Sequence, residues 1–337
     1  MTQVKPIDAA PPGETPAYTL AHLSDPHLTS LDGVRPAELL NKRLLGYLSW
    51  RARRRGEHRI EVLEALVEDL RRARPDHTVI TGDMTHVGLP RECRKVSEWL
   101  SSFMDPQHLT IVPGNHDAYV AAPWGKTMGL WTSYMAPDAV AGETRDTLFP
   151  ALRQRGPLAL IGLSTACPTP PFFATGRAGA AQLAALEQVL RETGAQGRVR
   201  VLLIHHPPLK GSIGWRKRLE DADALCGIIA RQGVEVVLHG HTHRPAADLM
   251  ATGRGAVPVI GVPSASAIGH KPGRQAQYHL CRFHEGQRGW RLHVTVRGYD
   301  LETGRFIPRG ARQYSLPGEN GRVPGHEDID QRARRKR

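Results

Sequence analysis

The sequence contains few cysteines and no long apolar run, and both features narrow what the chain can be. Its four cysteines (Cys93, Cys167, Cys226 and Cys281) are far apart and form no CxxC pair, which excludes a disulfide framework and a cysteine zinc site. No segment approaches the roughly 18 apolar residues of a membrane-spanning helix. Residues 1–16 are polar and lack the apolar core of a secretory signal, so we expect a cytoplasmic protein.

Acidic residues are also in short supply. The chain has 33 Asp and Glu against 45 Lys and Arg, a formal net charge of +12. This excess favours anionic partners, which include phosphate-bearing substrates, anionic lipid surfaces and nucleic acid. Part of the excess lies near the C-terminus, where we expect residues 316–337 to be a basic disordered tail. With residues 1–16 as a disordered leader, a single domain is expected over residues 17–315.

The other concentration of positive charge is the basic segment, residues 39–55. Its leucines and aromatics recur among Lys and Arg at a spacing that predicts an amphipathic helix. Two interpretations fit this pattern equally well. The helix could lie on an anionic membrane surface, which would place the protein at the inner face of the membrane, or it could pack on the domain and expose its basic face to water.

The rest of the chain alternates between short β-branched runs and helical patterns. This order predicts crossover units with mainly parallel strands. Residues 118–156 show weak periodicity, as a lid insertion would. Three later runs, without long helices between them, suggest a second sheet with hairpin connections. The predicted strands are 18–24, 76–81, 109–113, 158–164, 199–204, 234–238, 258–262, 277–283 and 290–297, and the predicted helices are 60–73, 91–103, 180–191 and 221–231.

Five of the predicted strands end in side chains that bind metals. Because open α/β folds build their sites at the carboxyl ends of strands, these side chains are expected to converge. Carboxylate, amide and imidazole donors suit Mn, Fe, Zn or Co. Each motif alone is weak in a chain with 17 histidines, but five in succession are not. The candidates are Asp25 and His27, Asp83, Asn115 with His116 and Asp117, His205, and His241 with His243.

Together these motifs resemble the calcineurin-like metallophosphoesterase superfamily over residues 18–297, and the turn Gly82-Asp83-Met84-Thr85 is similar to that of its bacterial phosphodiesterase branch. The resemblance implies an α/β fold, a four-layer α/β/β/α sandwich of two mixed sheets with a dinuclear metal site at the strand ends. It implies two transition-metal ions (Mn, Fe or Zn) and selects His205 over His206 as a ligand. One ion would take Asp25, His27, Asp83 and His243, and the other Asp83, Asn115, His205 and His241.

The expected activity is hydrolysis of a phosphoester, with a phosphodiester as the favoured substrate. A hydroxide held between two cations would attack phosphorus in line. His116 would stabilise charge on the phosphate or protonate the leaving group, and Asp117 would orient its ring. The basic segment keeps an alternative open, a membrane-surface pyrophosphohydrolase of a nucleotide-sugar lipid of the UDP-diacylglucosamine type. A nuclease or a non-catalytic scaffold is less favoured, since no stacking platform for nucleic acid is evident and every expected ligand is present.

Overall fold

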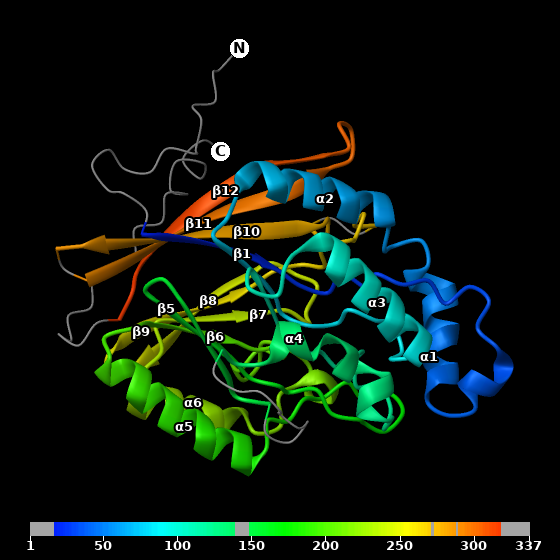
Figure 1. The fold of residues 1–337 in the computed structure, drawn as a ribbon, viewed down its shortest axis with the longest axis horizontal. Helices are drawn as coiled ribbons and strands as arrows, with labels where there is room; N and C mark the ends of the chain where they lie inside the picture. Colours follow the sequence, from blue (N-terminus) through cyan, green and yellow to red (C-terminus); the bar gives the residue numbers. More distant parts are fainter. Residues whose placement is uncertain (1–16, 139–147, 271–272, 288, 318–337) are drawn as a thin grey trace, which may run out of the picture.

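Two six-stranded mixed sheets stack face to face in the computed structural model of the chain, and helices cover their outer faces (Figure 1). The structure describes residues 17–138, 148–270, 273–287 and 289–317. The expected leader, residues 318–337 of the expected tail and residues 139–147 of the expected lid lie outside the described residues.

The first sheet combines strands from both ends of the chain. Its parallel strands are β1 (Tyr18–Leu23), β2 (His77–Ile80) and β3 (Leu109–Ile111). On the other side of β1 follow three antiparallel strands, β10 (Gln277–Gly286), β11 (Gly289–Asp300) and β12 (Arg305–Ser315). The outer face packs on α2 (Ile60–Ala73) and α3 (Pro90–Phe103) through apolar side chains of both helices and of the strands.

The second sheet comes from the middle of the chain. Its parallel strands are β5 (Leu158–Gly162), β6 (Val199–Leu203), β7 (Val236–His239) and β9 (Gly255–Gly261). Antiparallel strands form its two edges, β4 (Ala151–Arg155) and β8 (Ala246–Thr252). The outer face packs on α5 (Ala180–Ala195) and α6 (Ala222–Gln232).

A continuous apolar core fills the space between the two sheets. Leu20, Val79 and Phe283 of the first sheet pack in it with Val201 and Leu238 of the second, all buried. A sheet that is buried on both faces needs apolar side chains on both, which explains the apolar run of β5 and that of residues 201–203 in β6. The four-layer α/β/β/α prediction is therefore confirmed.

The prediction that residues 258–297 form a sheet of their own is wrong. The hairpin connections are present, but β9 joins the parallel strand β7, and β10 pairs with β1. Each of these strands completes the hydrogen bonding of a strand already in the core, which satisfies more buried backbone groups than a separate small sheet would.

The basic segment is helical and begins a little before its predicted start. A turn of 3₁₀ helix (Pro36–Leu39) precedes α1 (Arg43–Ser49), and a π-helical turn (Trp50–Arg54) follows it directly. The weakly periodic region contains two 3₁₀ turns (Trp124–Lys126 and Met128–Trp131) and α4 (Thr132–Met135), and a further 3₁₀ turn spans Trp215–Lys217. Among the described helices, none has the length and apolarity needed to cross a bilayer.

Candidate metal centre

The loops after β1, β2, β3, β6 and β7 carry all the predicted metal ligands, and the structure brings these loops together. Backbone hydrogen bonds join them in pairs: Asp25 N–H donates to Gly82 O (3.0 Å), and Gly240 N–H donates to His205 O (3.1 Å). His241 N–H also donates to Asp25 Oδ2 (3.1 Å), which ties a loop of the second sheet to one of the first. The centre therefore lies where the two sheets meet.

The first predicted ligand set is present as a compact group. Donor atoms of Asp25, His27, Asp83 and His243 all lie within 4.8 Å of one another. The ring of His27 donates from Nδ1 to the carbonyl of Thr85 (2.9 Å), and its buried Nε2 has no hydrogen-bond partner among the described residues. A histidine whose outer nitrogen is fixed by a carbonyl presents its other nitrogen to a metal. These residues fit a transition-metal ion.

The second predicted set centres on His205. Its Nε2 lies 3.3 Å from Asp83 Oδ2 and 3.2 Å from Asn115 Oδ1, while its Nδ1 donates to Thr81 O (2.6 Å). The ring of His241 lies beside it, with 5.0 Å between centroids. Asp83 thus belongs to the first set and also contacts the second, as a bridging carboxylate would.

His206 is the neighbour that the resemblance set aside. It groups with His205 and His241 in space, but both of its ring nitrogens already have partners. Nδ1 bonds with Thr165 Oγ1 (2.7 Å), and Nε2 donates to Ala174 O (3.2 Å). With both nitrogens engaged, His206 has no lone pair left to offer a metal.

The backbone of the ligand loops adopts a conformation that side chains rarely tolerate. Five of the predicted ligands have positive φ angles between 43° and 67°, namely Asp25, His27, Asp83, His241 and His243. Such strain persists only where the surroundings enforce it, and it gathers at functional sites. Gly114 and Gly240 allow the close approach, because a Cβ on the former would collide with the Asp83 carboxylate and one on the latter with Ser24 Oγ and Asp25.

Burial and charge set the protonation of the donors. Burial lowers the pKa of His27 and of His241 well below the usual 6.5, so both rings are neutral, the form that binds metals. Burial opposes protonation of His205 as well, but the Asp83 carboxylate outweighs it and raises the pKa of His205 to about 9. A cation bound between these two groups would displace that proton.

His116 lies beside the donors and is not one of them. Its backbone N–H donates to Asp83 Oδ1 (2.7 Å), and its ring Nδ1 donates to the carbonyl of His86 (2.5 Å). The expectation that Asp117 orients this ring is wrong. The Asp117 carboxylate instead accepts from the backbone N–H of Thr85 (3.0 Å) and of Gly114 (2.9 Å), so it joins two of the ligand loops.

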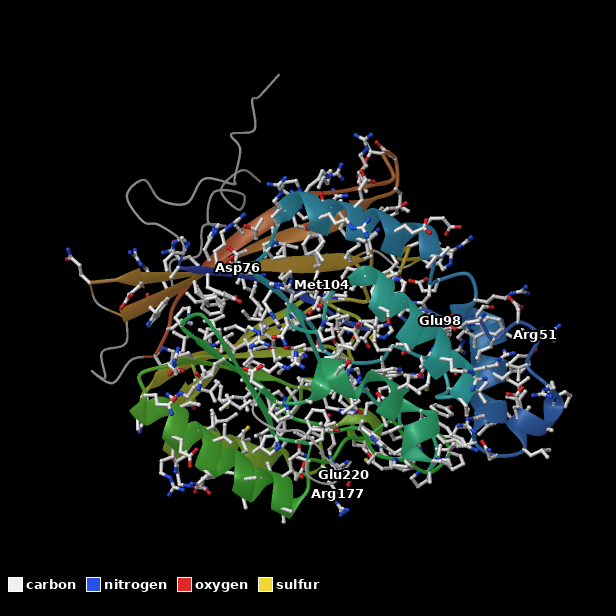
Figure 2. The ribbon with its side chains drawn as sticks, viewed as in Figure 1. Arg51, Asp76, Glu98, Met104, Arg177 and Glu220 are labelled. Carbon is white, nitrogen blue, oxygen red and sulfur yellow. The ribbon has the colours of Figure 1, made fainter. Side chains whose placement is uncertain are left out.

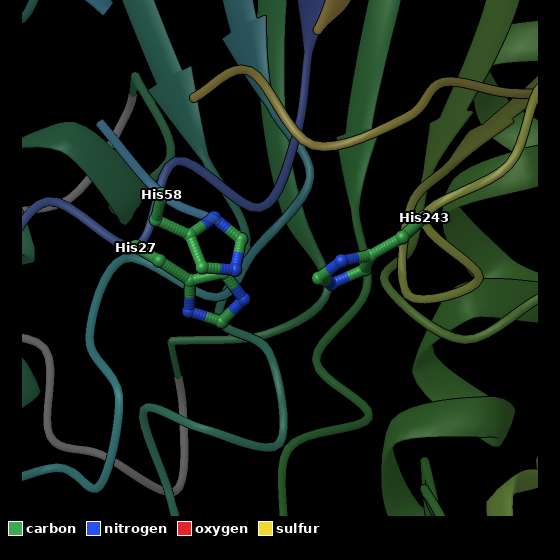
Figure 3. A group of neighbouring side chains, drawn as sticks. All are labelled: His27, His58 and His243. Atoms are coloured by element: carbon green, nitrogen blue, oxygen red, sulfur yellow. The ribbon is translucent and has the colours of Figure 1, made fainter. Parts of the chain in front are cut away.

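Three residues near the centre have no counterpart among the predicted ones. Arg54 Nη1 lies 2.9 Å from His116 Nε2, and His86 stacks on His27 with 5.0 Å between ring centroids. His58 and His27 lie side by side, with His243 opposite them (Figure 3). Arg54 and His58 stand in or just after the basic segment rather than after a strand, so the strand-end pattern does not find them.

Fold and site together define a class, the α/β/β/α domains with a cluster of Asp and His metal donors at their strand ends. The sequence model of the calcineurin-like phosphoesterase family matches residues 18–245, so the chain belongs to that family. The protein is therefore a metallophosphoesterase, a metal-dependent hydrolase of phosphoesters. No curated protein matched the sequence.

Solved structures agree on the fold. A dimetal phosphatase from Danio rerio is similar with a TM-score of 0.59 and 15% identity, over 87% of this chain and 99% of that one. Purple acid phosphatase PPD1 from yellow lupin (Lupinus luteus) is similar with a TM-score of 0.53 and 12% identity, over 88% of this chain and 53% of that one. At these identities the likeness concerns the fold.

Proposed function

We propose that the protein is a phosphodiesterase that uses two transition-metal ions, drawn from Mn, Fe and Zn. The observation that carries the proposal is the place of Asp83, which groups with Asp25, His27 and His243 and also contacts His205. The similarity of the turn Gly82-Asp83-Met84-Thr85 to the bacterial phosphodiesterase branch supports a diester substrate.

Each of the two donor sets would bind one metal ion. Asp25, His27, Asp83 and His243 would hold one ion, and Asp83, Asn115, His205 and His241 the other. When bound, the ions supply Lewis acidity that activates water and neutralises phosphoryl charge during in-line displacement.

His116 acts on the substrate from beside the metals. Burial and the Arg54 guanidinium lower the pKa of His116 well below 6.5, so its ring is neutral before substrate binds. An anionic phosphoester beside the ring opposes both effects and favours the protonated form, whose Nε2–H can donate to the leaving oxygen. The His86 carbonyl fixes the ring throughout.

Model esters test the proposed diester preference. The protein would be loaded separately with Mn²⁺, Zn²⁺ and Fe²⁺, and its kcat/KM would be compared on bis-p-nitrophenyl phosphate and on p-nitrophenyl phosphate. A higher value for the diester supports the proposal, and a higher value for the monoester overturns it. Absence of turnover in protein shown to hold two metals per chain also contradicts it.

A second candidate is hydrolysis at a membrane surface, on a diphosphate-linked nucleotide-sugar lipid. The observation that favours it is an outward apolar face on the basic segment, where Leu40, Leu44 and Leu48 are 83%, 47% and 52% exposed. Exposed arginines flank this face, among them Arg51 at the outer edge of the molecule (Figure 2). Apolar side chains between cations suit an anionic bilayer surface.

Vesicle sedimentation tests the second candidate. The wild-type protein should sediment with vesicles of phosphatidylcholine and phosphatidylglycerol more than with phosphatidylcholine alone, and the double variant Leu44→Ser, Leu48→Ser should lose that binding. Leu301→Ser is the matched control, because Leu301 is 59% exposed on the turn between β11 and β12. If the wild-type protein does not sediment with anionic vesicles, the membrane-surface candidate is excluded. Assays on cyclic AMP and on a UDP-sugar lipid then separate the two substrate classes.

A further inference from the structure

Arg54 places a guanidinium at the metal centre from the last residue of the π-helical turn. Its side chain is half-buried, and Nη1 lies 2.9 Å from His116 Nε2. Arginine can only donate and the His86 carbonyl can only accept, so the His116 ring carries its proton on Nδ1 and accepts from Arg54 at Nε2. Across the described residues, no carboxylate forms an ion pair with Arg54.

The position of Arg54 is fixed by contacts of the helix before it. Arg43 donates from Nε to Val87 O (3.0 Å) and from Nη2 to Gly88 O (2.7 Å), and Trp50 is buried against Val87 and Leu89. These carbonyls belong to the loop that follows Asp83. The helix and the ligand loop are therefore held in one arrangement.

Gly46 brings α1 close to that loop. A Cβ at this position would come within 2.6 Å of Val87 Cγ1 and 2.8 Å of the Tyr119 hydroxyl. Tyr119 in turn stacks on His116, with 5.6 Å between ring centroids. The glycine thus lets the helix that carries Arg54 approach the surroundings of His116.

Arg54 is not the only cation near the predicted metal donors. Burial lowers the pKa of Lys217, and the charges of Arg54, Arg274 and Arg244 lower it further, while the Asp83 carboxylate raises it. Lys217 and Arg244 are also next to the donors, since the Lys217 carbonyl accepts from His241 Nε2 (3.0 Å) and Arg244 follows His243. Positive side chains beside the predicted metal donors favour the binding of an anion.

We propose that Arg54 is a substrate-binding residue whose guanidinium donates to the non-bridging oxygens of the phosphoryl group next to His116. The neutral imidazole that it now contacts is a weaker acceptor than a charged phosphoryl oxygen, so a bound phosphoester takes over these donors. The planar fork of arginine matches two such oxygens at once. This inference rests on the proposed hydrolase function and adds to it the group that recognises the phosphate.

The role is tested with Arg54→Ala and Arg54→Lys, and with Arg71→Ala as the matched control, at an exposed arginine in the last turn of α2. Three quantities would be measured in each variant: metal content, KM and kcat on bis-p-nitrophenyl phosphate, and the Kd of inorganic phosphate for the metal-loaded protein by calorimetry. Arg54→Ala should raise both KM and the phosphate Kd about 10- to 100-fold with metal content unchanged. Arg54→Lys should recover part of the lost affinity, because lysine keeps the positive charge but lacks the planar guanidinium that binds two oxygens at once. Arg71→Ala should match wild type.

The phosphate measurement separates this inference from the proposed function. If the wild-type protein turns over no diester but Arg54→Ala still weakens phosphate binding, the phosphodiesterase proposal fails and the role of Arg54 stands. If KM and the phosphate Kd stay within about twofold of wild type in Arg54→Ala, Arg54 does not bind the phosphoryl group. Loss of metal in both Arg54 variants would show a structural role and would also overturn the inference.

Discussion

Asp83 Oδ2 and His205 Nε2 lie 3.3 Å apart, although Asp83 follows a strand of the first sheet and His205 follows a strand of the second. Both side chains are buried. The contact places the metal centre across the junction of the sheets, and a carboxylate with two oxygens can reach donors on both sides. Packing of the two sheets is therefore what assembles the site.

Removal of the Asp83 carboxylate should empty at least one metal position. In Asp83→Ala neither donor set keeps its shared oxygen ligand, so elemental analysis of the purified variant should find at least one metal fewer per chain than in wild type. Asp223→Ala, at an exposed aspartate on α6, is the control and should keep the wild-type content. Full occupancy in Asp83→Ala would contradict its bridging role.

Loss of the His116 ring should affect the rate and not the metals. The ring bonds to the His86 carbonyl and to Arg54, so His116→Ala should lower kcat roughly 100-fold or more through loss of the proton donor. Metal content should match wild type. His108→Ala, at an exposed histidine just before β3, should change neither quantity. A variant that lost its metals would show that His116 supports the centre itself.

The cluster of candidate metal donors could be predicted from the sequence because each donor follows a buried strand. Strand ends of parallel sheets meet at one edge, so local patterns at five separated positions indicate one place in space. The resemblance selects His205 over its neighbour as a ligand. In the structure His205 Nε2 faces Asp83, whereas both nitrogens of His206 have partners in Thr165 and Ala174.

Other features could not be predicted, for physical reasons. β8 and β12 are edge strands with many exposed positions, so they lack the apolar runs that mark a buried strand. Arg54 and His58 reach the centre through the packing of α1 on the loop after Asp83, a contact between segments that no local periodicity encodes. The apolar residues of the basic segment fit either a helix packed on the domain or a helix with an exposed apolar face, and sequence periodicity does not separate the two. The structure shows both features, since Trp50 is buried while Leu48 is exposed.

Acid should destabilise the protein through buried neutral histidines, of which His77 is a test case remote from the metal centre. Burial and the nearby Arg155 lower the pKa of His77 to about 3, from 6.5. Between these values the unfolded chain binds a proton that the folded chain rejects, so the free energy of unfolding falls as pH drops below 6.5. The loss between pH 7 and pH 5 from this residue is roughly 2 kcal/mol.

Urea unfolding at the two pH values would check this. The loss of stability from pH 7 to pH 5 should be smaller in His77→Gln than in wild type by roughly 2 kcal/mol. An equal loss in His77→Gln and wild type would mean that His77 is not held neutral by the fold.

Arg200 and Glu235 form a buried ion pair at the end of β6 opposite to His205. Arg200 donates from Nε to Glu235 Oε2 (2.9 Å) and from Nη2 to Oε1 (2.6 Å), and both residues are less than a tenth exposed. Arg200 Nη1 also donates to the carbonyl of Gln232 (2.7 Å), at the end of α6. The pair thus joins β6 to the segment that leads into β7.

Replacing one partner of this pair should destabilise the fold and leave the chemistry intact. Glu235→Gln leaves the buried Arg200 guanidinium without a counter-charge, which should lower the free energy of unfolding by about 3–5 kcal/mol in urea titrations. Glu187→Gln is the control, since the Arg231–Glu187 pair is exposed and contributes much less. The kcat of folded Glu235→Gln should equal that of wild type, because the pair lies at the far end of β6 from the predicted ligand His205. A drop in kcat without a loss of stability would mean that the position of β6, and not its stability, depends on this pair.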